Sequence, residues 1–117
     1  MKIVANQTLV YFVSLSSNAP AVLTEAIEKS ANHSISIFFD LDGAHVLDMR
    51  YLRNLNRTHG TDLEMLLQTA IQSGIKLFGC QMNVLIADGL ELIDGAELAG
   101  VASFLEVAYE ADAVLSY

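Results

Sequence analysis

The segment from Thr8 to Phe39, TLVYFVSLSSNAPAVLTEAIEKSANHSISIFF, decides the fold class of this chain. Its two ends, residues 8–16 and 34–39, are rich in β-branched and aromatic residues, which is typical of buried strands. Between them, Asn18 is placed to cap a helix and Pro20 suits a first helical turn. A strand, a helix and a second strand in this order predict a parallel β-α-β unit.

The same alternation continues to Tyr117. We expect further helices within 44–59, from the capping box at 61–64 to Gly74, at 81–87, and along the apolar stripe of Leu98, Val101, Ala102, Leu105 and Tyr109. We expect further strands at 75–78, 96–98 and 113–117. Residues 1–117 are therefore predicted to form one α/β domain, a roughly five-stranded parallel sheet in three layers with helices on both faces.

The amino-acid composition indicates which classes of binding partner the chain can have. The chain is 53% hydrophobic, yet no apolar run approaches the roughly 18 residues that span a bilayer, so we expect no membrane partner. The surplus of apolar residues then belongs in a sheet covered on both faces or in a subunit interface, which favours a homo-oligomer. A net charge of −8 argues against a nucleic-acid partner, whose phosphates need lysine and arginine.

Cysteine content indicates the compartment. The chain has a single cysteine, so no internal disulfide can form, and this favours the reducing cytoplasm. The apolar stretch at residues 1–7 is too short for a signal peptide. We therefore expect a cytoplasmic protein.

Cys80 is the first candidate for reactive chemistry. It follows a predicted strand and Gly79, at the point where the next helix should begin. Free amides and the helix dipole at such a position favour a thiolate and lower the pKa of the thiol, whereas the carboxylates between Asp88 and Glu97 would raise it if they lay close. The alternative is a buried, small hydrophobic residue, which is the commoner role of a lone cysteine.

Two other strand ends carry polar clusters. The stretch 40–43, Asp-Leu-Asp-Gly, resembles the first motif of haloacid-dehalogenase-type phosphotransferases, but no Asp-Asp pair follows to hold Mg²⁺ and an acidic turn is the commoner interpretation. Residues 14–18 could cradle a phosphate at a helix start, or simply cap that helix. The three histidines lack ligand-like spacing, so we expect no metal. The chain has no tryptophan and these loops have no tyrosine to stack on a flavin ring, so we expect no cofactor.

Three blocks in order resemble one family. They are Phe38-Phe39-x-x-Asp42-Gly43, then Cys80-Gln81-Met82, then residues 91–106, ELIDGAELAGVASFLE. Together they are similar to the DsrE/DsrF-like sulfur-trafficking family, and most to its DsrE-like branch that carries the peroxiredoxin-family label. The sequence departs from that branch at Asp40, where a neutral residue is usual.

The resemblance implies a flavodoxin-like domain, trimers or hexamers, and a cysteine that accepts and passes on sulfane sulfur. That cysteine corresponds to Cys80, which would relay a persulfide between a donor protein and an acceptor protein. The residues expected to shape or support its pocket are Gly79, Gln81, Met82, Asp42, Gly43, Ser16 and Asn18. Two alternatives stay open: a non-catalytic oligomeric binding module of the same fold, and the Asp-x-Asp phosphotransferase.

Overall fold

The computed structural model describes residues 7–59, 63–80, 86 and 89–117, without the side chains of 55–59. Within these ranges five strands form one parallel sheet, in the order β4-β3-β2-β1-β5. The strands are β1 (Thr8–Val13), β2 (Ser34–Phe39), β3 (Lys76–Cys80), β4 (Ala96–Ala99) and β5 (Ala113–Ser116). The predicted α/β fold with a five-stranded parallel sheet is confirmed.

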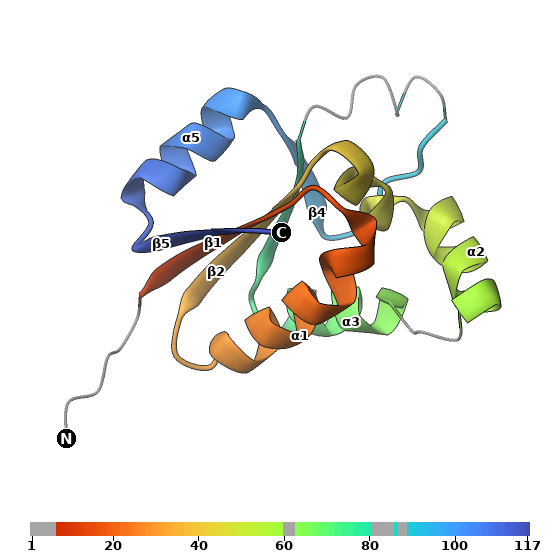
Figure 1. Cartoon of the computed structure of the whole chain (residues 1–117), viewed down its shortest axis with the longest axis horizontal. Helices are drawn as coiled ribbons and strands as arrows, with labels where there is room; N and C mark the ends of the chain where they lie inside the picture. The colour runs from red at the N-terminus through yellow and green to blue at the C-terminus, as the bar shows by residue number, and fades with distance from the viewer. Residues whose placement is uncertain (1–6, 60–62, 81–85, 87–88) are drawn as a thin grey trace.

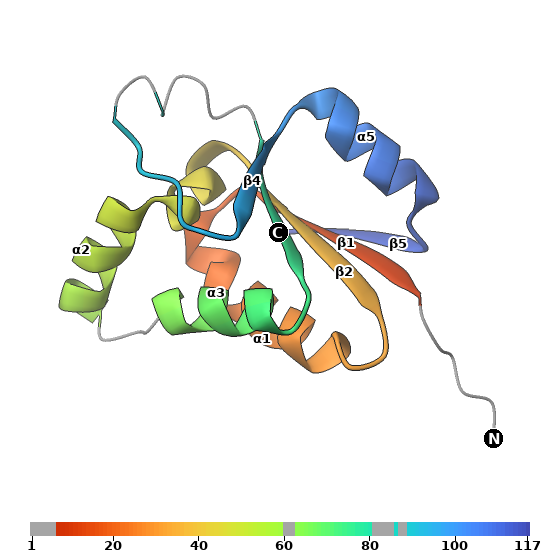
Figure 2. The same ribbon diagram turned by 180° about the vertical axis from the view of Figure 1, so that it is seen from behind.

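Helices cover the two faces of the sheet unequally (Figures 1 and 2). They are α1 (Ala19–Lys29), α2 (Met49–His59), α3 (Leu63–Gln72) and α5 (Val101–Glu110). The chain steps in one direction from β1 to β4, so right-handed crossovers place α1, α2 and α3 on one side. The return from β4 to β5 reverses the direction, and α5 therefore crosses the opposite face.

Local sequence signals explain the helix ends. Helix α3 ends in a Schellman motif: the amide of Ile75 donates to Ala70 O and that of Gly74 donates to Ile71 O, with Gly74 at φ +86°. The predicted end at Gly74 is confirmed. Asn18 stands at the N-cap of α1 as predicted, but its side chain makes no capping hydrogen bond. Thr61 of the predicted capping box lies outside the described residues.

The sheet separates two apolar cores. The larger one lies between the sheet and α1 and α3, and includes the fully buried Tyr11, whose hydroxyl donates to Glu25 at 2.6 Å. The smaller one lies under α5 and consists of the buried Val10, Phe38 and Cys80 with half-buried side chains packed against them. The candidate cysteine therefore belongs to the thinner side of the molecule.

Three predictions about local structure were wrong. Strand β3 continues through Gly79 and Cys80, because these residues pair with Leu98 and Ala99 of β4. The acidic turn expected at 40–43 is largely part of a 3₁₀ helix, η2 (Leu41–Leu47), which begins before the helix expected within 44–59. The helix expected along the apolar stripe is present as α5, but Leu98 of that stripe lies in β4, and the stripe is turned outward, with Leu105 58% exposed and Tyr109 92% exposed.

Candidate functional site around Cys80

Cys80 is the last residue of β3, at the carboxyl edge of the sheet, and its side chain is 2% exposed. The predicted helix start directly after it, at 81–87, lies largely outside the described residues, as do the predicted pocket residues Gln81 and Met82. Within the described residues, Gly79 pairs with Phe39 of β2 and with Leu98 of β4. The thiol is thus held by regular sheet, two strands away from β1.

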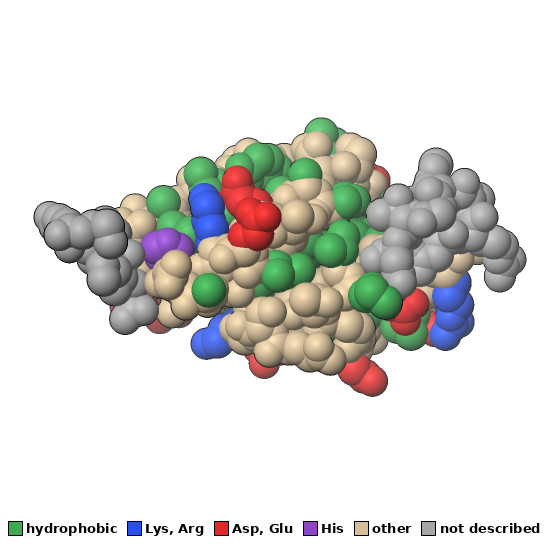
Figure 3. Space-filling model, turned by 90° about the horizontal axis from the view of Figure 1, so that it is seen from below, with side chains coloured by type: hydrophobic (Ala, Val, Ile, Leu, Met, Phe, Trp, Pro, Cys, Tyr) green, Lys and Arg blue, Asp and Glu red, His purple; other side chains and the backbone are tan. Residues whose placement is uncertain are grey.

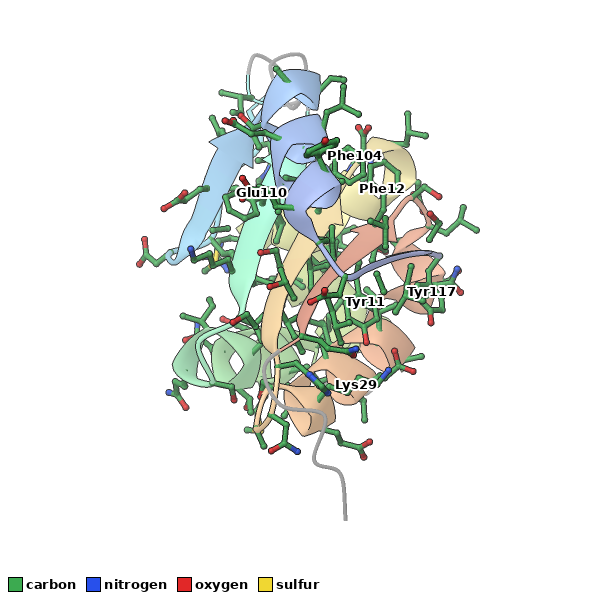
Figure 4. The ribbon with its side chains drawn as sticks, turned by 90° about the vertical axis from the view of Figure 1, so that its left-hand side faces the viewer. Tyr11, Phe12, Lys29, Phe104, Glu110 and Tyr117 are labelled. Carbon is green, nitrogen blue, oxygen red and sulfur yellow. The ribbon has the colours of Figure 1, made fainter. Side chains whose placement is uncertain are left out.

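Aromatic rings close the core that contains Cys80. Phe38 and Phe78 stack with ring centroids 4.7 Å apart. Phe104, from α5, meets both Phe38 and Phe12 edge-on, each at 5.1 Å between centroids. Figure 4 shows Phe104 and Phe12 next to each other where α5 crosses the sheet. Because all of these rings pack in the same cluster as Cys80, α5 acts as the cover of the thiol.

The electrostatic environment of Cys80 favours the neutral thiol. Burial raises the pKa of Cys80, and the negative charge of Asp40 raises it further. The expectation of a lowered pKa was therefore wrong, since the strand continues through Cys80 and removes the thiol from water. The opposing charge comes from the end of β2, whereas the sequence pointed only to the carboxylates between Asp88 and Glu97.

A second cluster joins the two other strand ends. The backbone amide and the hydroxyl of Ser16 both donate to Asp42 Oδ2, each at 2.8 Å. These two hydrogen bonds are the largest causes of a lowered pKa at Asp42. Tyr51 donates from its hydroxyl to Ser16 Oγ at 3.3 Å, and its ring lies 5.8 Å from that of His45. The predicted residues Ser16 and Asp42 are therefore in direct contact.

Gly43 explains why these loops fit so tightly. A Cβ atom at this position would lie 2.2 Å from Val13 O, in the backbone of β1. The amide of Gly43 also donates to Ser14 O at 3.0 Å. No other residue can occupy this position without moving β1 or η2, so Gly43 fixes the distance between the ends of β1 and β2.

Both carboxylates of the Asp-x-Asp pair accept hydrogen bonds from the chain itself. Asp40 Oδ1 accepts from the amide of Leu41 at 2.7 Å, and Asp42 is held by Ser16. Within the described ranges, no three side chains among His, Cys, Asp and Glu are grouped so that they could hold a metal ion.

A buried carboxylate that the sequence analysis missed anchors the chain beyond Cys80. Asp48 is 5% exposed and accepts from the side chain of Arg50 and from the amides of Arg50 and Glu91. Burial opposes its charge, but these hydrogen bonds outweigh burial and keep the pKa of Asp48 below its ordinary value. The amide of Met49 also donates to Glu91 O at 2.8 Å. The segment that returns from the Cys80 edge towards β4 is thereby fixed.

Of the predicted site residues, the structure joins Ser16, Asp42 and Gly43 in one cluster and leaves Asn18 beside it at the start of α1. Gly79 and Cys80 are linked to that cluster through the β2–β3 pairing and the neighbouring end of β2.

Among the described residues, no helix is long and apolar enough to cross a membrane.

The five-stranded parallel sheet with helices on both faces defines a three-layer, flavodoxin-like α/β domain. The model of the DsrE/DsrF/DrsH-like family matches residues 17–115, and the chain belongs to that family. The structure is similar to the crystal structure of the YchN protein from E. coli, with a TM-score of 0.76 and 19% identity over 96% of this chain and 99% of that one. A search of curated protein sequences finds no match.

Proposed function

We propose that the protein is a sulfur relay in which Cys80 carries the sulfur as a persulfide. Membership of the DsrE-like family supports sulfur relay at the level of the family. The observation that carries the assignment to Cys80 is its position: it is the chain's single thiol, it stands at the carboxyl edge of the sheet, and that edge is where ligands meet parallel α/β sheets.

The transfer conserves sulfur and electrons. The Cys80 thiolate attacks the outer sulfur of a donor persulfide, R–S–SH, so that the Cys80–S–SH bond forms while the donor S–S bond breaks and leaves R–S⁻. An acceptor thiolate then attacks the outer sulfur of the Cys80 persulfide and returns the Cys80 thiolate. Donor and acceptor are proteins that present a cysteine, and no external oxidant or reductant is needed.

The burial of the Cys80 thiol adds a condition to the proposed sulfur transfer. The Cys80 thiol is nearly inaccessible and its pKa is raised, so the closed protein holds a protonated, protected sulfur. We infer that the partner must displace part of the cover formed by α5 before transfer. A carrier of this kind would protect its persulfide from small thiols between the two transfers.

Intact-mass spectrometry tests the relay directly. Wild-type protein incubated with a persulfidated rhodanese should gain about 32 Da per transferred sulfur, and reductant should remove the gain. Cys80→Ala should gain nothing and should still fold, because alanine suits a small buried apolar site. A wild-type protein that stays unmodified while its Cys80 reacts with iodoacetamide would contradict the relay, because the thiol would then be reachable and yet unable to accept sulfur.

The same burial favours one competing function, the non-catalytic binding module. If Cys80 is a packed core thiol, it should resist both alkylation and sulfur transfer until the protein is unfolded in denaturant. That result would replace the relay by the binding module.

We also propose that α5 is covered by a second copy of the chain. Val101, Leu105 and Tyr109 form an exposed apolar row at i, i+4 and i+8, and no residue of α5 is fully buried in the single chain. Light scattering should give a mass well above 12.7 kDa, and Leu105→Glu should lower it, whereas Glu110→Gln should not. A monomeric wild type would refute this assembly.

A cytoplasmic location remains part of the proposal, supported by the single cysteine.

A further inference from the structure

A hollow of about 350 Å³ lies on the α5 side of the sheet, at the opposite end of the strands from the carboxyl edge. It is formed by the first residues of β1, β2 and β3 together with Gly74, His33 and Val107 of α5. Its volume falls in the range of small-molecule sites, which begins near 300 Å³. Neither the family-level role nor the proposed relay uses this end of the sheet.

The floor of the hollow is polar where the rest of that face is apolar. Residues two apart on a strand share a face, so Ser36 lies on the side of Phe38 and Lys76 on the side of Phe78, facing α5. The β2–β3 register makes Ser36 and Lys76 direct neighbours, on strands about 4.8 Å apart. The side chains of Lys76, which carries an ammonium group, and Ser36, which carries a hydroxyl, therefore leave the sheet next to each other on the face that forms the floor of the hollow.

These polar groups have no partners within the described part of the chain. The hydroxyls of Ser34 and Ser36 and the ammonium of Lys76 make no hydrogen bond or ion pair there, whereas Lys29 pairs with Glu25 at 3.8 Å. His33, in the wall, has a buried Nδ1 without a hydrogen-bond partner. Buried polar atoms without partners are uncommon in native proteins, so the wall of the hollow holds a polar group that its own fold leaves unsatisfied.

The walls limit the kind of ligand. Phe78 and Val107 supply apolar surface beside the polar floor. Glu97 lines an adjoining hollow of about 200 Å³ that shares Lys76 with the first, and Asp112 accepts from the amide of Thr8 at 2.6 Å. Figure 3 views the molecule from below and shows basic and acidic side chains interspersed with apolar ones. Lys76 is the one lysine or arginine among the lining residues of the larger hollow, so it can balance one negative charge but not the two of a dianion.

We propose that this hollow binds a small organic monoanion, a carboxylate carried on a short apolar body. The carboxylate would accept hydrogen bonds from the Lys76 ammonium and the Ser34 and Ser36 hydroxyls, and the apolar body would pack on Phe78 and Val107. Hydrogen bonds to charged groups are the strong ones, so the ammonium should supply most of the selectivity for an anion.

Benzoate is a suitable probe, with benzamide as its neutral counterpart of the same shape. In amide NMR titrations of the full chain, benzoate should cause saturable shifts at Ser36, Lys76 and Gly74 with a dissociation constant in the millimolar range. Benzamide should bind about tenfold more weakly, a difference of about 1.4 kcal/mol. Equal binding of the two probes would overturn the proposal, and so would the absence of saturable shifts at these residues.

Two lysine variants provide the matched comparison. Lys76→Met keeps the apolar stem, should not disturb folding because the residue is exposed, and should weaken benzoate binding about tenfold. Lys29→Met removes the paired lysine of α1 and should leave benzoate binding unchanged. If both variants weaken binding equally, the effect is one of net charge and not of this hollow, and the proposal fails. Since none of these readouts involves Cys80, the result is independent of the sulfur relay.

Discussion

Replacing Phe104 with alanine should destabilise the protein and uncover the Cys80 thiol. The ring makes two edge-on contacts, with Phe12 and Phe38, each at 5.1 Å. Two aromatic pairs contribute about 1–3 kcal/mol, and truncation of a fully buried phenylalanine costs about 3–5 kcal/mol. Because Phe104 is only half-buried, we expect a loss of about 2–3 kcal/mol in the free energy of unfolding.

Urea denaturation measures that loss, provided that the m-value is unchanged. Alkylation of Cys80 by iodoacetamide under native conditions measures the opening of the cover. If the thiol reacts only from opened molecules, a loss of 2–3 kcal/mol should raise the alkylation rate by about 30- to 150-fold. Glu106→Ala is the control, since this exposed side chain lies on the same helix and should shift the free energy of unfolding by less than about 0.5 kcal/mol.

The two readouts together make the reasoning refutable. A large loss of stability with an unchanged alkylation rate would mean that the thiol is reached from another side of the sheet. A rise in alkylation without a loss of stability would mean that the ring blocks access but does not support the core. Either result would show that α5 is not the cover that links packing to the reactivity of Cys80.

Three further substitutions test the end of β2, the close approach at Gly43 and the buried Asp48. Asp40→Asn should move the pH profile of Cys80 alkylation to lower pH, but not to that of a free cysteine, since burial is the larger cause of the raised pKa. Gly43→Ala should cost more than about 3 kcal/mol or prevent folding, because its Cβ would collide with β1. Gly100→Ala has open space around it and should cost at most about 1 kcal/mol in chemical denaturation, since it only replaces glycine at the N-cap of α5. The Asp48 carboxylate has a lowered folded-state pKa, so its stabilisation is present above its ordinary pKa and is lost as the pH falls through the folded value. Asp48→Asn should therefore cost about 1–3 kcal/mol at neutral pH, and its denaturation midpoint should approach that of the wild type below about pH 4.

The strands and the parallel sheet could be predicted because their signals are local. The run at 8–13 is apolar on both faces, which only a doubly covered sheet accommodates, and the run at 34–39 ends in the apolar Ile37, Phe38 and Phe39. Gly74 likewise marks the end of α3 by its own conformational freedom. Strand runs and helix ends of this kind depend on residues that are close in sequence, so they can be predicted without knowing the tertiary structure.

The surroundings of Cys80 could not be predicted because they depend on long-range pairing. The register of β3 with β4 decides that Cys80 belongs to a strand, and the crossover of α5 decides that Phe104 and not Leu105 faces the sheet. Helical spacing identifies an apolar stripe but does not indicate which of two apolar faces meets the core, and α5 is apolar on both. One signal for the raised pKa of Cys80 was available in the sequence: Asp40 carries a negative charge directly after β2, the strand next to β3.

The strand order also has a consequence for how the chain folds. Neighbouring strands β1 to β4 follow one another in sequence, but β5 returns to β1, and the hydrogen bond between Thr8 and Asp112 spans 104 positions. Contacts of such separation form late, since the loop they close carries the largest entropic cost. We therefore expect the docking of α5 and β5 to be among the last steps of folding. Until α5 docks, Cys80 lacks its cover, so the folding chain exposes to oxidation the residue that the finished protein encloses.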